Sequence, residues 1–68
     1  MTITVHVNGE LRSLEAPVAL AGLVSALTAA PSGVAAAVNE TVVPRTRWAA
    51  TALADGDRVE ILTAVQGG

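Results

Sequence analysis

The run Thr2-Ile3-Thr4-Val5-His6-Val7-Asn8-Gly9 does most to decide the fold of this chain. Every second residue from Ile3 to Val7 is apolar, and this period of two predicts a strand with one buried face. Asn8-Gly9 is the strongest short signal for a hairpin, because a type I′ turn needs a positive φ at both central positions. Residues 10–15 are therefore predicted to return as a second strand. Its Leu11 and Leu14 are three apart, which breaks the alternation and admits a bulge.

One apolar stripe at helical spacing follows this pair of strands. It consists of Leu20, Leu23, Val24 and Leu27. The spacing i, i+3, i+4, i+7 places these residues on one face of a helix, which we predict at about residues 18–29. Pro17 ends the preceding strand, and the Pro-Ser-Gly sequence at 31–33 ends the helix. The helix has no N-terminal Ser, Thr, Asp or Asn cap, so packing has to hold it.

The second half of the chain predicts two short strands, an irregular segment and a last strand. Residues 34–39 and 42–43 have strand-like sequences, and the second of them stops at a proline. Residues 45–54 are interpreted as a single turn or a short 3₁₀ piece, with Trp48 as a core plug whose indole N–H is hydrogen-bonded. The Asp-Gly-Asp sequence at 55–57 predicts a tight turn, and residues 58–64 form the last strand.

This order of elements, ββαββ with a late crossover before a final strand, indicates one α+β domain over residues 1–68. It predicts a mixed sheet of about four or five strands packed on one helix.

The composition excludes several function classes. The chain has 68 residues, no cysteine and a net charge of -2, and its four cationic side chains are all arginines. Without cysteine there is neither a disulfide nor a thiolate metal site, and an acidic chain is a poor ligand for nucleic acid. No apolar run approaches the ~20 residues of a membrane span, and the first residues lack a basic signal-peptide region. We therefore expect a cytoplasmic protein with no membrane or nucleic-acid partner.

No group of side chains in the sequence predicts an active site. His6 is the single histidine, with no metal set and no nucleophile to serve, so a solvated or packing role is expected. Asp55 and Asp57 suggest a cation site, but turn chemistry accounts for both. The serines lack a base partner, and the scattered glycines form no phosphate loop. We predict no catalytic residue, no metal and no enzyme activity of the chain's own.

The last four residues, Val65-Gln66-Gly67-Gly68, are the remaining candidate for function. They are either a frayed chain end or a segment that inserts into a partner. Insertion is feasible because backbone without Cβ enters a slot too narrow for other residues. Extended, they reach ~13 Å at about 3.3 Å per residue. Leu62, on the strand face opposite Val59 and Ile61, is either an ordinary exposed leucine or part of a docking surface beside this tail.

Three segments, residues 37–48, 51–61 and 64–68, resemble the ThiS family of ubiquitin-like sulfur carriers in thiamine thiazole biosynthesis. The resemblance covers the whole chain, and the motifs of its second half are specific. In order along the chain, these motifs are Val38-Asn39, Val43-Pro44-Arg45, Trp48, Leu53-Ala54-Asp55-Gly56-Asp57 and the terminal Gly67-Gly68.

The resemblance implies a ubiquitin-like β-grasp fold and chemistry at the Gly68 carboxylate. A ThiF-type adenylating enzyme would use ATP and Mg²⁺ to form an acyl-adenylate on Gly68, with no cofactor bound to the carrier itself. Sulfur from a persulfide donor would then leave a thiocarboxylate, which thiazole synthase would consume with a deoxyxylulose phosphate-derived intermediate. A flexible tail, residues 65–68, would place Val65, Gln66 and Gly67 in partner active sites, while Leu62 and Arg45 would contribute to the partner surface. We expect the free protein to be a monomer.

Three alternative functions remain open at this stage. The small subunit of molybdopterin synthase also has a β-grasp fold and a Gly-Gly end, but it is usually longer and lacks the Val-Pro-Arg…Trp pattern. A protein modifier would form isopeptide bonds through Gly68. A plain interaction domain would carry an inert Gly-Gly.

Overall fold

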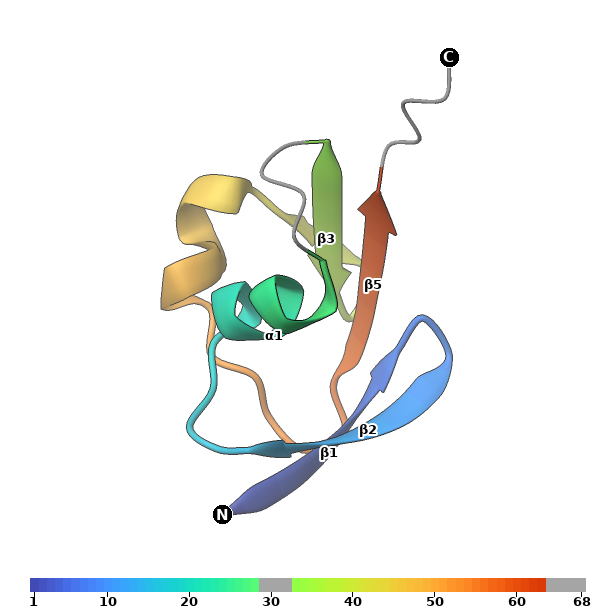
Figure 1. Cartoon of the computed structure of the whole chain (residues 1–68), viewed down its shortest axis with the longest axis vertical. Coiled ribbons are helices and arrows are strands. Elements are labelled where there is room, and N and C mark those ends of the chain that lie inside the picture. The colour runs from blue at the N-terminus through green and yellow to red at the C-terminus, as the bar shows by residue number, and fades with distance from the viewer. Residues whose placement is uncertain (29–32, 64–68) are drawn as a thin grey trace.

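The computed structural model describes residues 1–28 and 33–63. Within these residues the sheet has five strands in the order β2-β1-β5-β3-β4, and one α-helix and one 3₁₀ helix accompany it (Figure 1). The elements in chain order are β1 (Thr2–Val7), β2 (Glu10–Glu15), α1 (Leu20–Leu27), β3 (Val34–Val38), β4 (Thr41–Val43), η1 (Arg45–Ala50) and β5 (Arg58–Thr63). The sheet is mixed, since β1 runs parallel to β5 and the other pairs are antiparallel. The predicted α+β architecture is confirmed.

The first hairpin forms as its sequence predicts. Asn8 and Gly9 have φ values of 51° and 85°, the two positive values that the type I′ turn requires. The pairing of β1 with β2 is continuous from Val7↔Glu10 to Thr2↔Glu15, so no bulge is present. Leu14 packs on the core while Leu11 is 66% exposed. The alternation breaks because β2 is an edge strand that meets the core mainly at one position, not because the pairing slips.

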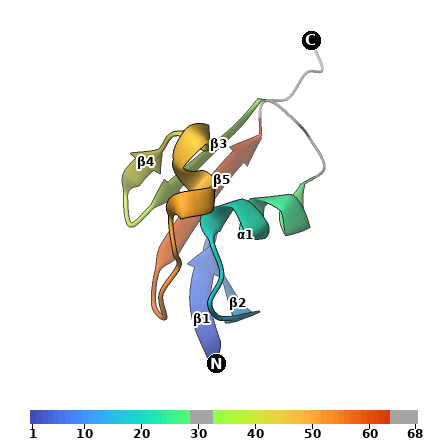
Figure 2. The ribbon, with the colours of Figure 1, turned by 90° about the vertical axis from the view of Figure 1, so that its left-hand side faces the viewer.

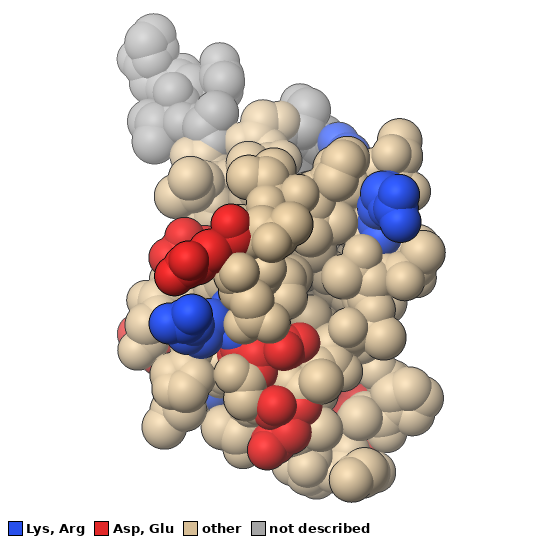
Figure 3. Space-filling model, turned by 180° about the vertical axis from the view of Figure 1, so that it is seen from behind, with Lys and Arg blue, Asp and Glu red and all other residues tan. Residues whose placement is uncertain are grey.

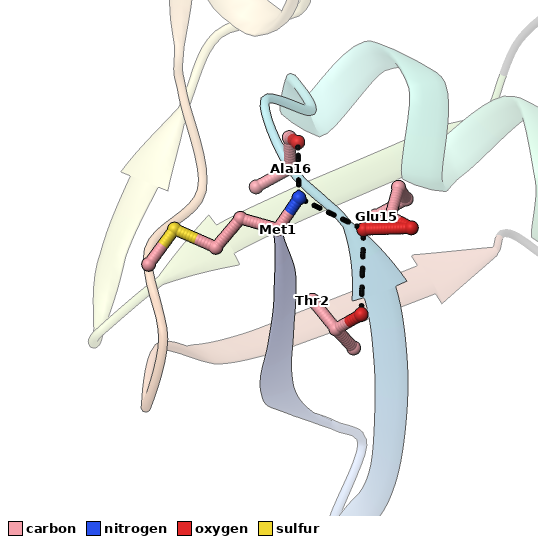
Figure 4. Close-up of polar contacts among 4 residues, drawn as sticks. All are labelled: Met1, Thr2, Glu15 and Ala16. Carbon is pink, nitrogen blue, oxygen red and sulfur yellow. Dashed lines mark hydrogen bonds and ion pairs between the residues drawn. The ribbon is translucent and has the colours of Figure 1, made fainter.

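Polar contacts close the open end of this hairpin (Figure 4). The Met1 amine lies 3.1 Å from Glu15 Oε2 and donates a 3.4 Å hydrogen bond to the Ala16 carbonyl. The Thr2 hydroxyl donates to the same Glu15 oxygen at 3.3 Å. Both ends of the ion pair are exposed, so its contribution to stability is small.

The helix α1 begins two residues later than predicted. Ala19 is extended and forms an isolated bridge with Ala52, and the Leu53 N–H donates to the Val18 carbonyl at 2.9 Å. Residues 18 and 19 therefore pair with a remote segment instead of starting the helix. No side chain caps the first turn, as expected, and the Leu20 N–H donates to the Thr51 carbonyl. At its other end α1 stops at Leu27, and the rest of the predicted range reaches residue 29, which lies outside the described residues.

The second half also follows the predicted order with small shifts at strand ends. β3 ends at Val38, one residue early, because Asn39 and Glu40 take left-handed φ values of 51° and 71° and turn the chain into β4. β4 begins at Thr41, one residue before the predicted start. The irregular segment contains the 3₁₀ helix η1, which confirms the short 3₁₀ interpretation. The prediction for Ala64 in the last strand lies outside the described residues.

The core lies between α1 and one face of the sheet (Figures 1 and 2). Trp48 is buried there, and its indole N–H donates to the Val43 carbonyl at 2.8 Å, as predicted. None of the described helices is long and apolar enough to span a membrane. The buried side chains are Ile3, Val5, Val7, Leu20, Leu23, Val24, Ala36, Trp48, Leu53, Val59 and Ile61.

Candidate functional site

The predicted tail, Val65, Gln66, Gly67 and Gly68, lies outside the described residues. The structure does describe the strand that leads to it. β5 is the central strand of the sheet, between β1 and β3, and its last residue Thr63 pairs with Val34 of β3. The last described strand therefore lies in the middle of the sheet rather than at an edge.

Leu62 lies on the sheet face turned away from α1, as predicted. Val59 and Ile61 are buried, at 1% and 7% exposure, and the alternation of β5 sends Leu62 to the other side, where it is 69% exposed. Leu62 pairs with Ala35, and Val42 of the neighbouring hairpin is 73% exposed. We call the apolar group on this face the Leu62 patch; it consists of Ala35, Ala37, Val42 and Leu62, which together with Glu60 line a shallow hollow.

Acidic side chains, with arginine side chains beside them, lie on the side of the molecule turned away from α1 (Figure 3). Glu60 lies on β5, the strand of Leu62, and borders the hollow of the Leu62 patch. Arg58, two residues before it, forms an exposed ion pair with Glu40 at 3.6 Å. Glu60 thus gives the surroundings of the patch a carboxylate that a cationic group of a partner can pair with.

Arg45 does not share a surface with Leu62. It begins η1, and its guanidinium carbon lies 5.8 Å from the centroid of the Trp48 ring. Together with Ala21 and Ser25 it lines a hollow between η1 and α1, on the helix side of the sheet. The structure therefore separates the two residues that were predicted to contact a partner, and the role of each in binding stays a prediction.

The aspartates at the β5 turn are structural, which confirms the turn interpretation. Asp55 Oδ1 accepts the Thr4 N–H at 2.7 Å, and Asp57 Oδ2 accepts the Ala54 N–H at 2.8 Å. Gly56 supplies the positive φ of 89° that the turn needs. Among the described residues no three or more His, Asp or Glu side chains are grouped to hold a metal ion. His6 is exposed on β1.

Two asparagines have a role that sequence reasoning missed. The sequence predicts Asn8 in a turn and Asn39 at the end of a strand, and each has a left-handed φ of 51°. Each also uses its side-chain amide on the main chain of β5: Asn8 contacts Ile61, and Asn39 contacts Arg58. The sequence shows only two Asn residues at the ends of strands. That both side chains bond the main chain of β5 is visible only in the tertiary structure.

The fold and the site together define a class of protein: a ubiquitin-like β-grasp domain whose central strand carries the C-terminal segment. Within this class the chain belongs to the ThiS family, whose sequence profile matches residues 5–68. Members of this family are small sulfur carriers rather than catalysts. The predicted family and fold are thereby confirmed.

Solved structures of the thiamine biosynthesis protein ThiS from Geobacter metallireducens resemble this chain closely. The crystal structure has a TM-score of 0.77 at 32% identity and covers 97% of this chain and 100% of that one. The solution structure has a TM-score of 0.79 at 32% identity, over 97% and 88% of the two chains.

Two further relatives are similar in sequence. A thiazole synthase of Magnetococcus marinus is 38% identical over 64 residues, which is 94% of this chain. This chain spans only 20% of the length of that protein. The uncharacterized protein ycf40 of Pyropia yezoensis is 33% identical over 66 residues, covering 97% of this chain and 93% of that protein.

Proposed function

We propose that this chain carries sulfur for thiazole formation in thiamine biosynthesis, on the carboxyl group of Gly68. The observation that supports this most is the extent of the family match, which runs to Gly68 itself. None of the buried side chains of the described residues is polar or charged. The chain also has no cysteine to carry sulfur in another way.

The proposed chemistry begins with activation of the Gly68 carboxylate, which is a poor electrophile. A ThiF-type enzyme brings the Gly68 carboxylate oxygen to the α-phosphorus of ATP, with Mg²⁺, and pyrophosphate leaves. The terminal sulfur of a donor persulfide then attacks the carbonyl carbon of the acyl-adenylate, and AMP leaves. A thiol reduces the resulting S–S bond and supplies its two electrons, which leaves a thiocarboxylate on Gly68. Thiazole synthase takes this sulfur. ATP and Mg²⁺ belong to the enzyme, and the carrier binds neither.

The residues before Gly68 suit delivery into an enclosed site. Residues 65–68 reach ~13 Å when extended, at about 3.3 Å per residue. Gly67 and Gly68 have no Cβ, so this end fits a channel that admits only backbone. Partner enzymes would then bind the folded body of the domain, residues 1–28 and 33–63, while Gly68 enters the active site.

We assign the Leu62 patch to the surface that partner enzymes bind. It is apolar and exposed, its Leu62 lies on β5, the strand that leads to the C-terminal segment, and Glu60 lines its hollow. A partner surface with apolar contacts and a cationic rim complements it. Arg45, on the other side of the sheet, would serve a partner that also reaches η1. The monomeric state and the cytoplasmic location of the free protein stay predictions.

The decisive experiment measures the intact mass after incubation with an adenylating enzyme, ATP, Mg²⁺, a persulfide donor and a reducing thiol. The expected result is the increase that replacement of one oxygen by sulfur gives. Deletion of Gly68 should abolish the shift and leave the melting temperature unchanged. An unshifted wild-type mass in the presence of an enzyme that is active on another carrier would refute the proposal.

The same experiment separates the alternatives. Covalent conjugates to other proteins would indicate a modifier. Rescue of a molybdenum-cofactor mutant, instead of a thiazole auxotroph, would indicate the molybdopterin route.

A further inference from the structure

The two sides of β5 are supported unequally near its end. On one side β3 pairs with β5 from Val38↔Val59 to Val34↔Thr63. On the other side the ladder with β1 contains only His6↔Arg58 and Val7↔Val59. The chain of β1 then turns away at the hairpin, so β5 continues beyond the end of its parallel neighbour.

The side chain of Asn8 takes the place of the missing strand. Asn8 Oδ1 accepts the Ile61 N–H at 2.9 Å, and Asn8 Nδ2 donates to the Ile61 carbonyl at 3.1 Å. The Asn8 main-chain N–H donates to Val59 O at 2.9 Å, so Asn8 is hydrogen-bonded to two residues of β5, Val59 and Ile61. A carboxamide has the donor and acceptor of a peptide group, and both contacts with Ile61 are partly buried. Asn8 thereby extends the β1–β5 ladder by one rung.

Asn39 provides an internal comparison at the opposite end of the same strand. It has the same φ of 51°, and its Oδ1 accepts the Arg58 N–H at 3.0 Å. Its Nδ2 donates to Asp57 Oδ1 at 3.0 Å. Asn39 therefore holds the start of β5, whereas Asn8 holds the part that leads into the C-terminal segment.

We propose that Asn8 is a positioning residue for the transfer reaction: it fixes Ile61 and so sets the direction of β5 up to its last described residue, Thr63. The proposal rests on the function proposed above, in which Gly68 is the reacting group. Val34, on the β3 side, is the first residue of its strand, and a terminal rung alone frays easily. Support from both sides restricts the orientations of the chain that follows, and this lowers the ordering cost when Gly68 enters a partner site.

The test uses three variants, Asn8→Gly, Asn8→Asp and Asn39→Gly. Glycine keeps the positive φ of each turn and removes only the amide, so each glycine variant is expected to fold. Asn8→Asp keeps an acceptor for the Ile61 N–H but places a second oxygen against the Ile61 carbonyl. Asn39→Gly is the matched control, since it removes an equivalent amide from the end of β5 remote from Gly68.

Two measurements are made on each variant below its melting transition. The first is amide hydrogen exchange at Ile61 by NMR, which we expect to be about fivefold faster or more in Asn8→Gly, the factor for one lost hydrogen bond of ~1 kcal/mol, and to be accelerated less in Asn8→Asp, which keeps the acceptor. The second is the rate of Gly68 activation by a ThiF-type enzyme, followed as pyrophosphate release. We expect kcat to fall about three- to tenfold for both Asn8 variants. KM should change less than about twofold, because the Leu62 patch is unchanged in them. Asn39→Gly should speed exchange at Arg58 and leave kcat unchanged.

The outcomes separate the positioning role from a merely stabilising one. Equal kcat values for Asn8→Gly and Asn39→Gly, or unchanged exchange at Ile61 in Asn8→Gly, would overturn the proposal. If wild-type protein is not activated at all, the proposed function fails and the positioning role fails with it. In that case exchange at Ile61 still shows separately whether Asn8 supports β5.

Discussion

At the scale of single residues, Trp48 shows how a core of small aliphatic side chains uses its one aromatic. Its ring is buried among residues of the sheet and α1, while its N–H reaches the carbonyl of half-buried Val43. The exposed guanidinium of Arg45 lies over the ring. One side chain thus fills volume, satisfies a main-chain acceptor and anchors η1.

Replacement of Trp48 by Phe tests the polar part of this role. Phe keeps an aromatic ring in the core but leaves the Val43 carbonyl without its donor, at a cost of about 1–3 kcal/mol in the free energy of unfolding. For a domain of this size each 1 kcal/mol lowers the melting temperature by roughly 4–8 °C. Thermal unfolding followed by far-UV circular dichroism measures the change. A variant as stable as the wild type would show that the indole hydrogen bond contributes nothing.

Leu62 and Leu11 form a matched pair for the docking surface. Both are exposed leucines, at 69% and 66%, and both lie on the sheet face away from α1, but only Leu62 is on β5. Leu62→Ala should lower kcat/KM for activation by a ThiF-type enzyme about tenfold, since an anchor residue of an interface contributes ~1–2 kcal/mol. Leu11→Ala should leave kcat/KM unchanged, and neither should alter the melting temperature. Equal effects of the two variants on kcat/KM would remove Leu62 from the interface.

At the scale of elements, the structure shows where local sequence patterns are sufficient to predict a turn or a helix end. Asn8-Gly9 and Gly56 sit in turns that require positive φ, and both turns form where the sequence predicts them. The start of α1 is different, because residues 18 and 19 extend the apolar pattern of a helix yet bridge to residues 52 and 53. Local periodicity has no information about that remote partner.

Gly56 and Gly22 should respond to alanine with opposite signs. Gly56 has φ +89° and open space where a Cβ would lie, so Gly56→Ala adds only backbone strain, about 1–2 kcal/mol of destabilisation. Gly22 is exposed on α1, and a Cβ there would lie 3.7 Å from Val18 Cγ2, an ordinary contact. Gly22→Ala should stabilise by ~0.5–1 kcal/mol through helix propensity. Urea unfolding midpoints measure both, and a destabilised Gly22→Ala would contradict the packing described for α1.

At the scale of the whole molecule, β5 links the two halves of the sheet. Its parallel pairing with β1 joins residues 6 and 58, and its antiparallel pairing with β3 connects it to the second hairpin. The side chains of Val5, Leu20 and Val59, one from each of three elements, are fully buried in one cluster. We therefore expect the described part of the chain to unfold in one cooperative transition.

Val59→Ala and Val42→Ala test this with the same chemical change at two sites. Val59 is 1% exposed at the centre of the sheet and Val42 is 73% exposed on β4. Val59→Ala should cost about 2–3 kcal/mol from lost burial and the cavity, and Val42→Ala less than about 0.5 kcal/mol. In Val59→Ala, Trp48 fluorescence and far-UV circular dichroism should lose native signal together. Separate transitions would mean that the two hairpins unfold independently.

The sequence by itself determined the elements of this protein and the family to which it belongs. Strand alternation, the Asn-Gly and Asp-Gly-Asp turns and the helical stripe are local patterns, and the Val-Pro-Arg…Trp and Gly-Gly motifs are read in order along the chain. The same alternation placed Leu62 opposite Val59 and Ile61, because a strand has a period of two.

Only the tertiary structure decided which strands are neighbours and which polar groups meet. It placed β5 at the centre of the sheet, separated Arg45 from Leu62, drew residues 18 and 19 out of the helix, and brought Asn8 to Ile61 across 53 positions of sequence. Each of these outcomes depends on a hydrogen-bonding or packing partner that is distant along the chain. A residue's own sequence neighbourhood carries no record of such a partner, so these features appear only when the core closes and the main-chain groups of β5 must be satisfied.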